Sequence, residues 1–402
     1  MKTATCLLSL LIAWGRLACA AEESSAASGA KGVPTAAKPA EDASIAKSLN
    51  PKIAAMGDAT WLKMSPNPEP TQRCYSSFFR GGDGKFFYFG GCHGGYEYDD
   101  IAFYDMAANR WTASWQDRKP GTRQPTNATI NKHYETTGRL EPIHMYQQVC
   151  WYPERGTYFM SGLLGTWEFD PVKMKWSWLL PGIAVASKEH EAQKLKPVPA
   201  TRWAWQTMTC FYSPPRKTPI IVLTTSPYEV HFWDQQAGQW QKLVDRIPKH
   251  LIWAEPYETY ITHLGCHLIR GGGAKSAAGS ALHYWFLFEP KTGKFTEVAV
   301  PDELSNTEAF CYDPVTKLVL LFCWGDAGGS KRIDVWTFDL ATMKTARVRT
   351  SGPTPQNEPR FQPVLYAPEH NAFLYLNHVS GNADETWVYR HRRLAAASQE
   401  MK

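Results

Sequence analysis

The sequence predicts an all-β protein, a six-bladed β-propeller whose ring is closed by an N-terminal strand. Three observations lead to this fold: the composition, a hairpin pattern that recurs five times, and a last repeat that lacks one strand. The chain has 402 residues, with 17 Trp, 18 Phe, 18 Tyr, 29 Gly and 28 Pro. Aromatic residues favour strands, and glycine and proline favour turns, so this composition favours β-structure over helix.

The recurring hairpin is an aromatic or apolar pair ending in an acid, with a further residue six positions later that is aromatic in four copies. An apolar run precedes each hairpin, and a strand with an aromatic residue before its turn precedes most of these runs, which makes four strands per repeat. The five copies, given by the acid and the later residue, are Asp105 and Trp111, Asp170 and Trp176, Asp234 and Trp240, Glu289 and Phe295, and Asp339 and Thr345.

The sixth repeat is incomplete. It supplies strands at 360–366, 372–379 and 386–390, after which no fourth strand follows. The segment 59–64 resembles the tryptophan-bearing fourth strand of the other repeats, because it contains Trp61. Pairing of this segment with 386–390 closes the ring and removes the exposed edges of an open sheet.

Residues 1–20 have the pattern of a secretory signal. Lys2 is followed by an apolar stretch that ends in the small-x-small sequence Ala18-Cys19-Ala20. We therefore expect a secreted or periplasmic protein whose mature chain has no transmembrane span. Cys19 allows a lipid-anchored alternative, which Arg16 disfavours because a lipoprotein signal has an apolar residue at that point.

The rest of the chain divides by composition. Residues 21–57 are rich in Ala, Ser, Lys and Pro, so we expect a disordered linker there. Residues 58–391 hold the propeller, and residues 392–402 form a C-terminal tail. The formal net charge of +5 is too small to favour nucleic acid as a partner, and we expect a monomer.

Several motifs of the repeats resemble those of the kelch-repeat family and of the wider galactose oxidase-like propellers. They are Gly90-Gly91, the hairpin from Tyr104-Asp105 to Trp111, and an arginine after proline at the start of a later repeat, as in Pro359-Arg360. The resemblance covers 58–391 and is weakest in the fourth repeat. It implies a propeller fold and leaves the ligand open.

The long connections all belong to the face that carries the blade-to-blade segments and the loops between second and third strands. Function usually lies on loops that a rigid scaffold holds, so we expect a recognition module that binds a glycan, acidic in one version of the hypothesis, or an extracellular protein or other macromolecule. Aromatic rings beside cations suit sugars that bear carboxylate or sulfate groups. The predicted ligand-binding residues are Arg73, His93, Tyr96, Arg123, His144, Arg202, Tyr228, Trp253 and Arg360.

Arg73, Arg202 and Arg360 lie at or just before the first strands of the first, third and sixth repeats, beside the central channel. His144 and Asn306 take this position in the second and fifth repeats, and Arg123 lies in the blade-to-blade segment 116–141. The arginines form a basic ring at the channel mouth in the functional interpretation. In the alternative, they tie neighbouring blades together by charge-assisted hydrogen bonds. The fourth repeat has no arginine at this point, and Tyr260 or His263 is the candidate counterpart.

Two enzymatic alternatives stay open at this point. A polysaccharide lyase needs a His or Tyr base and a cation that neutralises a carboxylate, and His93, His144 and Tyr146 are its candidate bases. A galactose oxidase-like copper site needs two Tyr and two His, one Tyr linked to a Cys, and Cys92-His93 lies in no such motif. We therefore predict no cofactor and no metal.

The cysteines of the first strands are expected to be buried, unreactive thiols. These residues are Cys74, Cys150, Cys210 and Cys311. The chain has 9 Cys, of which Cys6 and Cys19 lie in the signal, so an odd number remains and at least one is unpaired within the chain. Which of them pair stays open.

Overall fold

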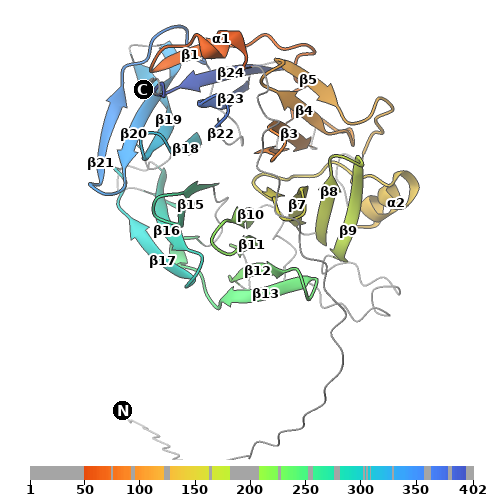
Figure 1. Ribbon diagram of the computed structural model, residues 1–402. Helices are drawn as coiled ribbons and strands as arrows, with labels where there is room; N and C mark the ends of the chain where they lie inside the picture. The colour runs from red at the N-terminus through yellow and green to blue at the C-terminus, as the bar shows by residue number, and fades with distance from the viewer. Residues whose placement is uncertain are drawn as a thin grey trace, which may run out of the picture. The chain divides into compact units, whose positions relative to one another are not determined.

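The computed structural model describes residues 49–394, apart from gaps at 74–75, 92–95, 122–126, 163–164, 182–207, 225–227, 252–256, 276–280, 302–303, 305–306, 308, 328–329, 357–363 and 379–382. The chain divides into the units Met1–Ala46 and Lys47–Lys402, and the described residues all belong to the second. Their strands form six four-stranded antiparallel sheets, which Figure 1 shows around a common axis. The six-bladed propeller predicted from the repeats is confirmed.

Each blade consists of four strands that are consecutive in the sequence, except the last. Blades 1 to 3 are β2 (Ser76–Arg80), β3 (Lys85–Gly90), β4 (Ala102–Asp105), β5 (Arg110–Ala113); β6 (Val149–Tyr152), β7 (Thr157–Gly162), β8 (Gly165–Asp170), β9 (Lys175–Pro181); and β10 (Met208–Ser213), β11 (Thr218–Leu223), β12 (Val230–Asp234), β13 (Gln239–Val244). Blades 4 to 6 are β14 (Tyr257–Ile261), β15 (Cys266–Lys275), β16 (Ala281–Glu289), β17 (Lys294–Val298); β18 (Ala309–Asp313), β19 (Leu318–Ala327), β20 (Ser330–Asp339), β21 (Lys344–Val348); and β22 (Leu365–Ala367), β23 (Ala372–His378), β24 (Asp384–Arg390) with β1 (Thr60–Lys63).

The N-terminal strand closes the ring as predicted. β1 pairs antiparallel with β24, and Trp61 lies opposite Tyr389 in the register. The Trp61 side chain is 1% exposed and packs edge-on against Phe322 of blade 5 and Tyr375 of blade 6. One residue therefore joins the edge strand of blade 6 to its own sheet and to the neighbouring blade.

The acid that recurs in the hairpins has a local structural role. Asp105, Asp170, Asp234 and Asp339 each accept a hydrogen bond from a backbone N–H two or three residues later, as in the 3.0 Å bond from Ala108 N to Asp105 Oδ1. Such Asx turns bend the chain between the third and fourth strands. Asn109 and Gly238 complete two of these turns with positive φ values of 48° and 60°, which Asn and Gly tolerate best.

The tryptophans that follow these turns pack between sheets. Trp111 and Trp176 are buried, whereas Trp240 is half-buried and donates from Nε1 to Thr166 Oγ1 of blade 2 at 2.8 Å. Two of the three hairpin tryptophans are thus buried, and the third lies between blades 2 and 3 with its indole N–H satisfied.

The folded unit begins before residue 58, earlier than composition predicted. Asn50 caps the short helix α1 (Pro51–Ala54), and Ile53 is fully buried. Arg390 of β24 donates to Met56 O at 3.0 Å, and Asn50 Nδ2 donates to Met106 O of blade 1 at 3.3 Å. The end of the expected linker is therefore a strap between blades 6 and 1.

A second helix interrupts the long connection between blades 1 and 2. α2 (Asn127–Thr137) is mostly polar and packs through Ile130, which is 1% exposed, against blade 2. In the described part of the chain, no helix is long and apolar enough to cross a membrane.

Candidate functional site on the loop face

The loop face is the side of the ring that carries the second-to-third-strand loops and the blade-to-blade connections; the opposite side, with its tight turns, is the hairpin face. Five predicted site residues lie in the described part: Arg73, Tyr96, His144, Tyr146 and Tyr228. The other five lie outside the described residues: His93, Arg123, Arg202, Trp253 and Arg360.

Arg73 is on the loop face but its guanidinium is enclosed. The residue is 2% exposed, and its Nη2 lies 2.8 Å from Asp100 Oδ2. Its Nη1 donates to the Asp100 carbonyl at 2.6 Å, and the guanidinium carbon lies 4.0 Å from the centre of the Tyr96 ring. These charge-assisted contacts lie within blade 1, and they leave a ligand little access to this cation.

The same cluster joins blade 1 to blade 6. The backbone N–H of Arg73 donates to Tyr88 Oη at 3.0 Å, and Tyr88 Oη donates to Asp384 Oδ2 of blade 6 at 2.7 Å. His378 Nδ1 lies 2.6 Å from the other oxygen of Asp384. Arg73, Tyr88, Asp100, His378 and Asp384, which we name the seam cluster, are thus a hydrogen-bonded set across the junction of the first and last blades.

Outward from this cluster lies an exposed cation. Tyr96 donates its hydroxyl to Asp100 Oδ1, and Arg118 Nη1 donates to that same hydroxyl oxygen at 3.1 Å. The Arg118 guanidinium also lies 4.6 Å from the ring centre of Tyr98, which is 38% exposed. We name Tyr96, Tyr98, Arg118 and Lys119 the ledge.

Arg118 has no acidic hydrogen-bond partner in the described part of the chain; Tyr96 is its only acceptor there. Burial raises the pKa of Tyr96 to about 12, so this acceptor is a neutral phenol at physiological pH. The hydrogen bond from Arg118 to Tyr96 in turn raises the pKa of Arg118. Arg118 is therefore a permanent, accessible and oriented positive charge on the ledge, whereas Lys119 lies 3.6 Å from Asp117.

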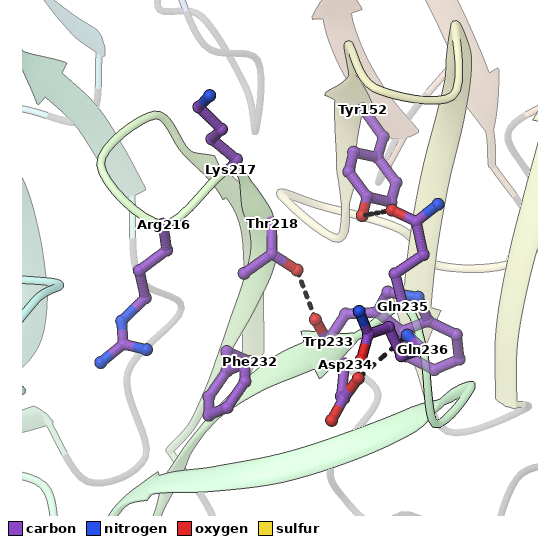
Figure 2. Close-up of a pocket in the computed structure, with 9 residues that line it drawn as sticks. All are labelled: Tyr152, Arg216, Lys217, Thr218, Phe232, Trp233, Asp234, Gln235 and Gln236. Atoms are coloured by element: carbon purple, nitrogen blue, oxygen red, sulfur yellow. Dashed lines mark hydrogen bonds between the residues drawn. The ribbon is translucent and has the colours of Figure 1, made fainter. Parts of the chain in front are cut away.

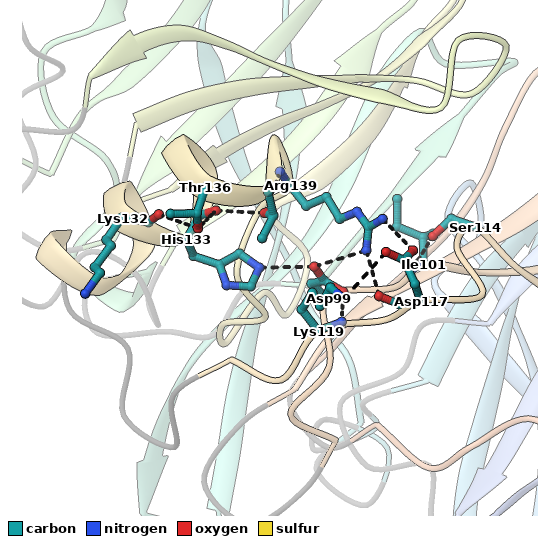
Figure 3. A network of polar contacts seen from close by, with 10 residues as sticks. Asp99, Ile101, Ser114, Asp117, Lys119, Lys132, His133, Thr136 and Arg139 are labelled. Atoms are coloured by element: carbon teal, nitrogen blue, oxygen red, sulfur yellow. Dashed lines mark hydrogen bonds and ion pairs between the residues drawn. The ribbon is translucent and has the colours of Figure 1, made fainter.

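A buried carboxylate next to the seam cluster fixes the ledge from beneath. Asp99 is fully buried and accepts from Lys119 N at 2.7 Å, while its own N–H donates to Lys119 O at 3.0 Å. Its other oxygen lies 3.1 Å from His133 Nε2 on α2 and 3.6 Å from Arg139 Nη1, as Figure 3 shows. The helix and the ledge thus share one anchor.

Asp99 and Asp100 point to opposite sides of the chain, as consecutive residues of an extended segment do. Sequence reasoning missed both. The available signal was a pair of acids directly after Tyr96 and Tyr98, shortly before a strand.

His144 and Tyr146, two candidate bases, are 4% and 7% exposed. Their segment lies close to the ring axis, because it contacts three other blades: Gly91 N donates to Ile143 O at 3.1 Å, Cys210 N to Gln147 O at 2.8 Å, and Glu258 N to Gln147 Oε1 at 2.9 Å. Because both side chains are buried, neither His144 nor Tyr146 is an accessible base.

Tyr228 is half-buried beside Val230 and Ile247 in blade 3. Its backbone has a φ of 63°, and its carbonyl accepts from Ile247 N at 2.8 Å. Tyr228 belongs to an apolar cluster of blades 3 and 4, whereas Tyr96 contacts Arg73, Asp100 and Arg118 in blade 1.

A second basic region lies at the outer edge of blade 5, near the loop face. Arg347 Nη2 lies 2.7 Å from Asp334 Oδ2, and Arg332 Nε lies 3.5 Å from Asp334 Oδ1. Arg349 beside them is exposed. The sequence analysis did not single out this groove of about 370 Å³, which is lined by Arg332, Asp334, Arg347, Val348, Arg349 and Thr350.

The hairpin face has a larger hollow, of about 740 Å³, between blades 2 and 3 (Figure 2). Its aromatic rings offer little free surface: Tyr152 and Trp233 are 1% and 4% exposed, and the Arg216 guanidinium covers Phe232 at 5.0 Å. Arg216 itself donates to Lys291 O at 3.0 Å. This hollow therefore offers neither an open ring nor an uncommitted arginine.

Among the described residues, no group of three or more His, Cys, Asp or Glu side chains could hold a metal ion. The acids beside the ledge are already engaged: Asp99 and Asp100 by arginines and a backbone N–H, and Asp117 by Arg139 at 2.7 Å and Lys119 at 3.6 Å.

No protein-family model and no curated protein matches the chain. Among solved structures, the extracellular domain of BT4673 from B. thetaiotaomicron aligns with 83% of this chain at 12% identity and a TM-score of 0.43; a second structure of that domain gives 84%, 11% and 0.43. This chain spans 40% of the length of those chains.

An oligogalacturonate lyase in complex with manganese aligns over 83% of this chain and 98% of its own, at 9% identity and a TM-score of 0.41. Identities and TM-scores this low leave the fold assignment to rest on the strand pairing described above. The kelch resemblance stays a prediction.

Proposed function

We propose that this protein is a recognition module that binds an acidic glycan, a polysaccharide with carboxylate groups on its sugar rings, at the ledge of blade 1. The observation that carries the proposal is Arg118, an exposed arginine oriented by Tyr96 and Tyr98 and without an acidic hydrogen-bond partner in the described part of the chain. A guanidinium has several N–H donors in a planar fork, and Arg118 uses one of them in its hydrogen bond to Tyr96.

The free donors of Arg118 suit a carboxylate, which accepts two parallel hydrogen bonds from such a fork. The exposed part of Tyr98 adds an apolar surface beside it, against which a sugar ring can place its C–H groups. Because Asp99 and Asp100 hold the backbone and Tyr96 beneath the ledge, little side-chain freedom is lost on binding, which favours affinity.

Titration calorimetry of the purified full-length protein with alginate, dextran sulfate and neutral dextran tests this function. We expect binding of alginate, no binding of dextran, and a loss of at least about tenfold in affinity for Arg118→Ala, the cost of one charge-assisted contact. Arg118→Lys keeps the charge and loses the fork, so it should fall between the two.

Arg110→Ala is the matched control, because it removes an exposed arginine from the same blade near the hairpin face. Binding should weaken with salt, since exposed charges are screened over about 8 Å at physiological ionic strength. Alginate binding that is unchanged in Arg118→Ala, or that persists in about 1 M salt, would contradict the proposal; preference for dextran sulfate over alginate would replace the carboxylate with a sulfate.

A further inference from the structure

Blades 2 and 3 bring two cysteines into direct contact beside the ring axis. Cys150 is on β6 and Cys210 is on β10, the innermost strands of their blades, and their sulfur atoms lie 3.9 Å apart. The side chains are 0% and 1% exposed. The structure holds both as thiols.

The backbone around this pair is fixed from both blades. Cys150 lies opposite Phe159 in the register of blade 2, and Cys210 lies opposite Ile221 in blade 3. Between the blades, the backbone N–H of Cys210 donates to Gln147 O at 2.8 Å. The two sulfur atoms therefore approach each other by the geometry of the blade junction rather than by a mobile loop.

The surroundings of the pair are apolar. Both cysteines belong to one buried cluster with Tyr152, Phe159 and Ile221, and each sulfur has the other as its hydrogen-bond partner. A thiol pair makes only a weak hydrogen bond. A disulfide would satisfy both sulfur atoms in the same space, after side-chain rotations that bring them to the bond length of about 2 Å.

We propose that Cys150 and Cys210 become joined by a disulfide that locks blade 2 to blade 3. The reaction is thiol–disulfide exchange with an external disulfide, such as oxidised glutathione or an oxidoreductase of the exporting compartment. The thiolate of one cysteine attacks a sulfur of that disulfide and releases one external thiol. The second cysteine then displaces the other external thiol, so two protein thiols are oxidised and one external disulfide is reduced to two thiols.

The bond should form during folding. Burial, with the adjacent Cys210 thiol, raises the pKa of the Cys150 thiol well above its ordinary value, which keeps Cys150 protonated and slow to react in the folded protein. An unfolded or partly folded chain exposes both thiols. The other described cysteines contact different groups: Cys266 Sγ lies 3.4 Å from Leu264 O, Cys311 Sγ lies 3.7 Å from Tyr312 O, and Cys323 Sγ lies 3.0 Å from Thr307 Oγ1.

The test is refolding of the full chain in a buffer of reduced and oxidised glutathione, followed by alkylation and non-reducing peptide mapping. The expected product is one peptide pair linked through Cys150 and Cys210. Reduction under denaturing conditions, followed by refolding without oxidant, should lower the thermal midpoint by several degrees, because the cross-link no longer restricts the unfolded chain. Two alkylated residues at these positions after oxidative refolding, or a link to other cysteines, would overturn the proposal.

Two variants isolate the pair. Cys150→Ala should have the same midpoint after oxidative and reductive refolding, whereas Cys311→Ala, a buried cysteine of another inner strand, should keep the difference. If Cys150→Ala does not fold, the peptide map of the unaltered chain still decides. None of these outcomes depends on whether the ledge binds a glycan.

Discussion

Blades 1 and 4 both bury an arginine against a tyrosine near the ring axis, but they supply it from different strands. In blade 1, Arg73 precedes the first strand and its guanidinium lies 5.4 Å from the ring centre of Tyr88. In blade 4, Arg270 comes from the second strand and lies 5.5 Å from the ring centre of Tyr257. Their exposed fractions are 2% and 3%.

The comparison shows that two blades form a similar buried contact between an arginine and a tyrosine, although the arginine comes from a different strand in each blade. Counting along the repeat suggested Tyr260 or His263 as the counterpart of Arg73. Instead, Tyr260 stacks on His267 with ring centres 4.8 Å apart, and His263 Nδ1 lies 2.7 Å from Tyr312 Oη. The neighbours differ as well: Arg73 faces the carboxylate of Asp100, whereas the charge of Arg270 helps to lower the pKa of His283, after burial.

The largest effect that this comparison predicts is the loss of Arg73. Arg73→Ala should lower the free energy of unfolding by about 3–5 kcal/mol, because Asp100 stays buried without its charge partner. Arg118→Ala, an exposed arginine of the same loop face, should change it by less than about 0.5 kcal/mol. Urea denaturation of both variants measures the two changes in the free energy of unfolding. Equal changes would show that the burial of Arg73 contributes no more to stability than the exposed Arg118 does.

A smaller effect is expected from the bond that joins blade 1 to blade 6. Tyr88→Phe removes the hydroxyl that donates to Asp384 Oδ2 at 2.7 Å and should cost about 1–3 kcal/mol, the range for a buried acceptor left without a donor. Tyr98→Phe, which alters a partly exposed tyrosine, is the matched control and should be nearly neutral. If the two variants unfold at the same urea concentration, the seam cluster does not contribute to closure.

The sequence predicted the elements whose causes are local. The hairpins were predictable because the aspartate and the backbone N–H group that it binds lie within a few consecutive residues, as Asp105 and Ala108 do. Closure was predictable because a missing strand and a spare strand with Trp61 can be counted. The strap that contains α1 was missed because Ile53 and Met56 are isolated apolar residues in a polar segment. Their packing partners lie in blades 6 and 1, far away in the sequence.

The candidate site was less predictable, because exposure is decided by three-dimensional packing. Arg73 and Arg118 are both basic residues near aromatics in the sequence. Only the approach of Asp100 encloses Arg73 and leaves Arg118 at the surface. The sulfur contact of Cys150 and Cys210 likewise depends on the angle at which two blades meet, which no spacing records.

The smallest predicted effect distinguishes the environment of Arg270 from that of Arg73 by pH. Burial, with Arg270 nearby, lowers the pKa of His283 from 6.5 to about 4. The unfolded chain therefore binds a proton at this residue at a higher pH than the folded chain does, and stability falls as the pH drops from about 6.5 towards 4. His283→Gln can still donate to Gly271 O, which His283 Nδ1 contacts at 3.0 Å, but it has no proton to gain.

Thermal midpoints of the unaltered chain and of His283→Gln, measured from pH 8 to pH 4, test this. The difference between them should be constant above about pH 6.5 and should shift in favour of the variant below it. Part of the slope should persist in the variant, because burial also lowers the pKa values of His231, His370 and His391. A difference that does not change with pH would mean that His283 is protonated as easily in the fold as in the unfolded chain, and that the polar environment of blade 4 is open to water where that of blade 1 is closed.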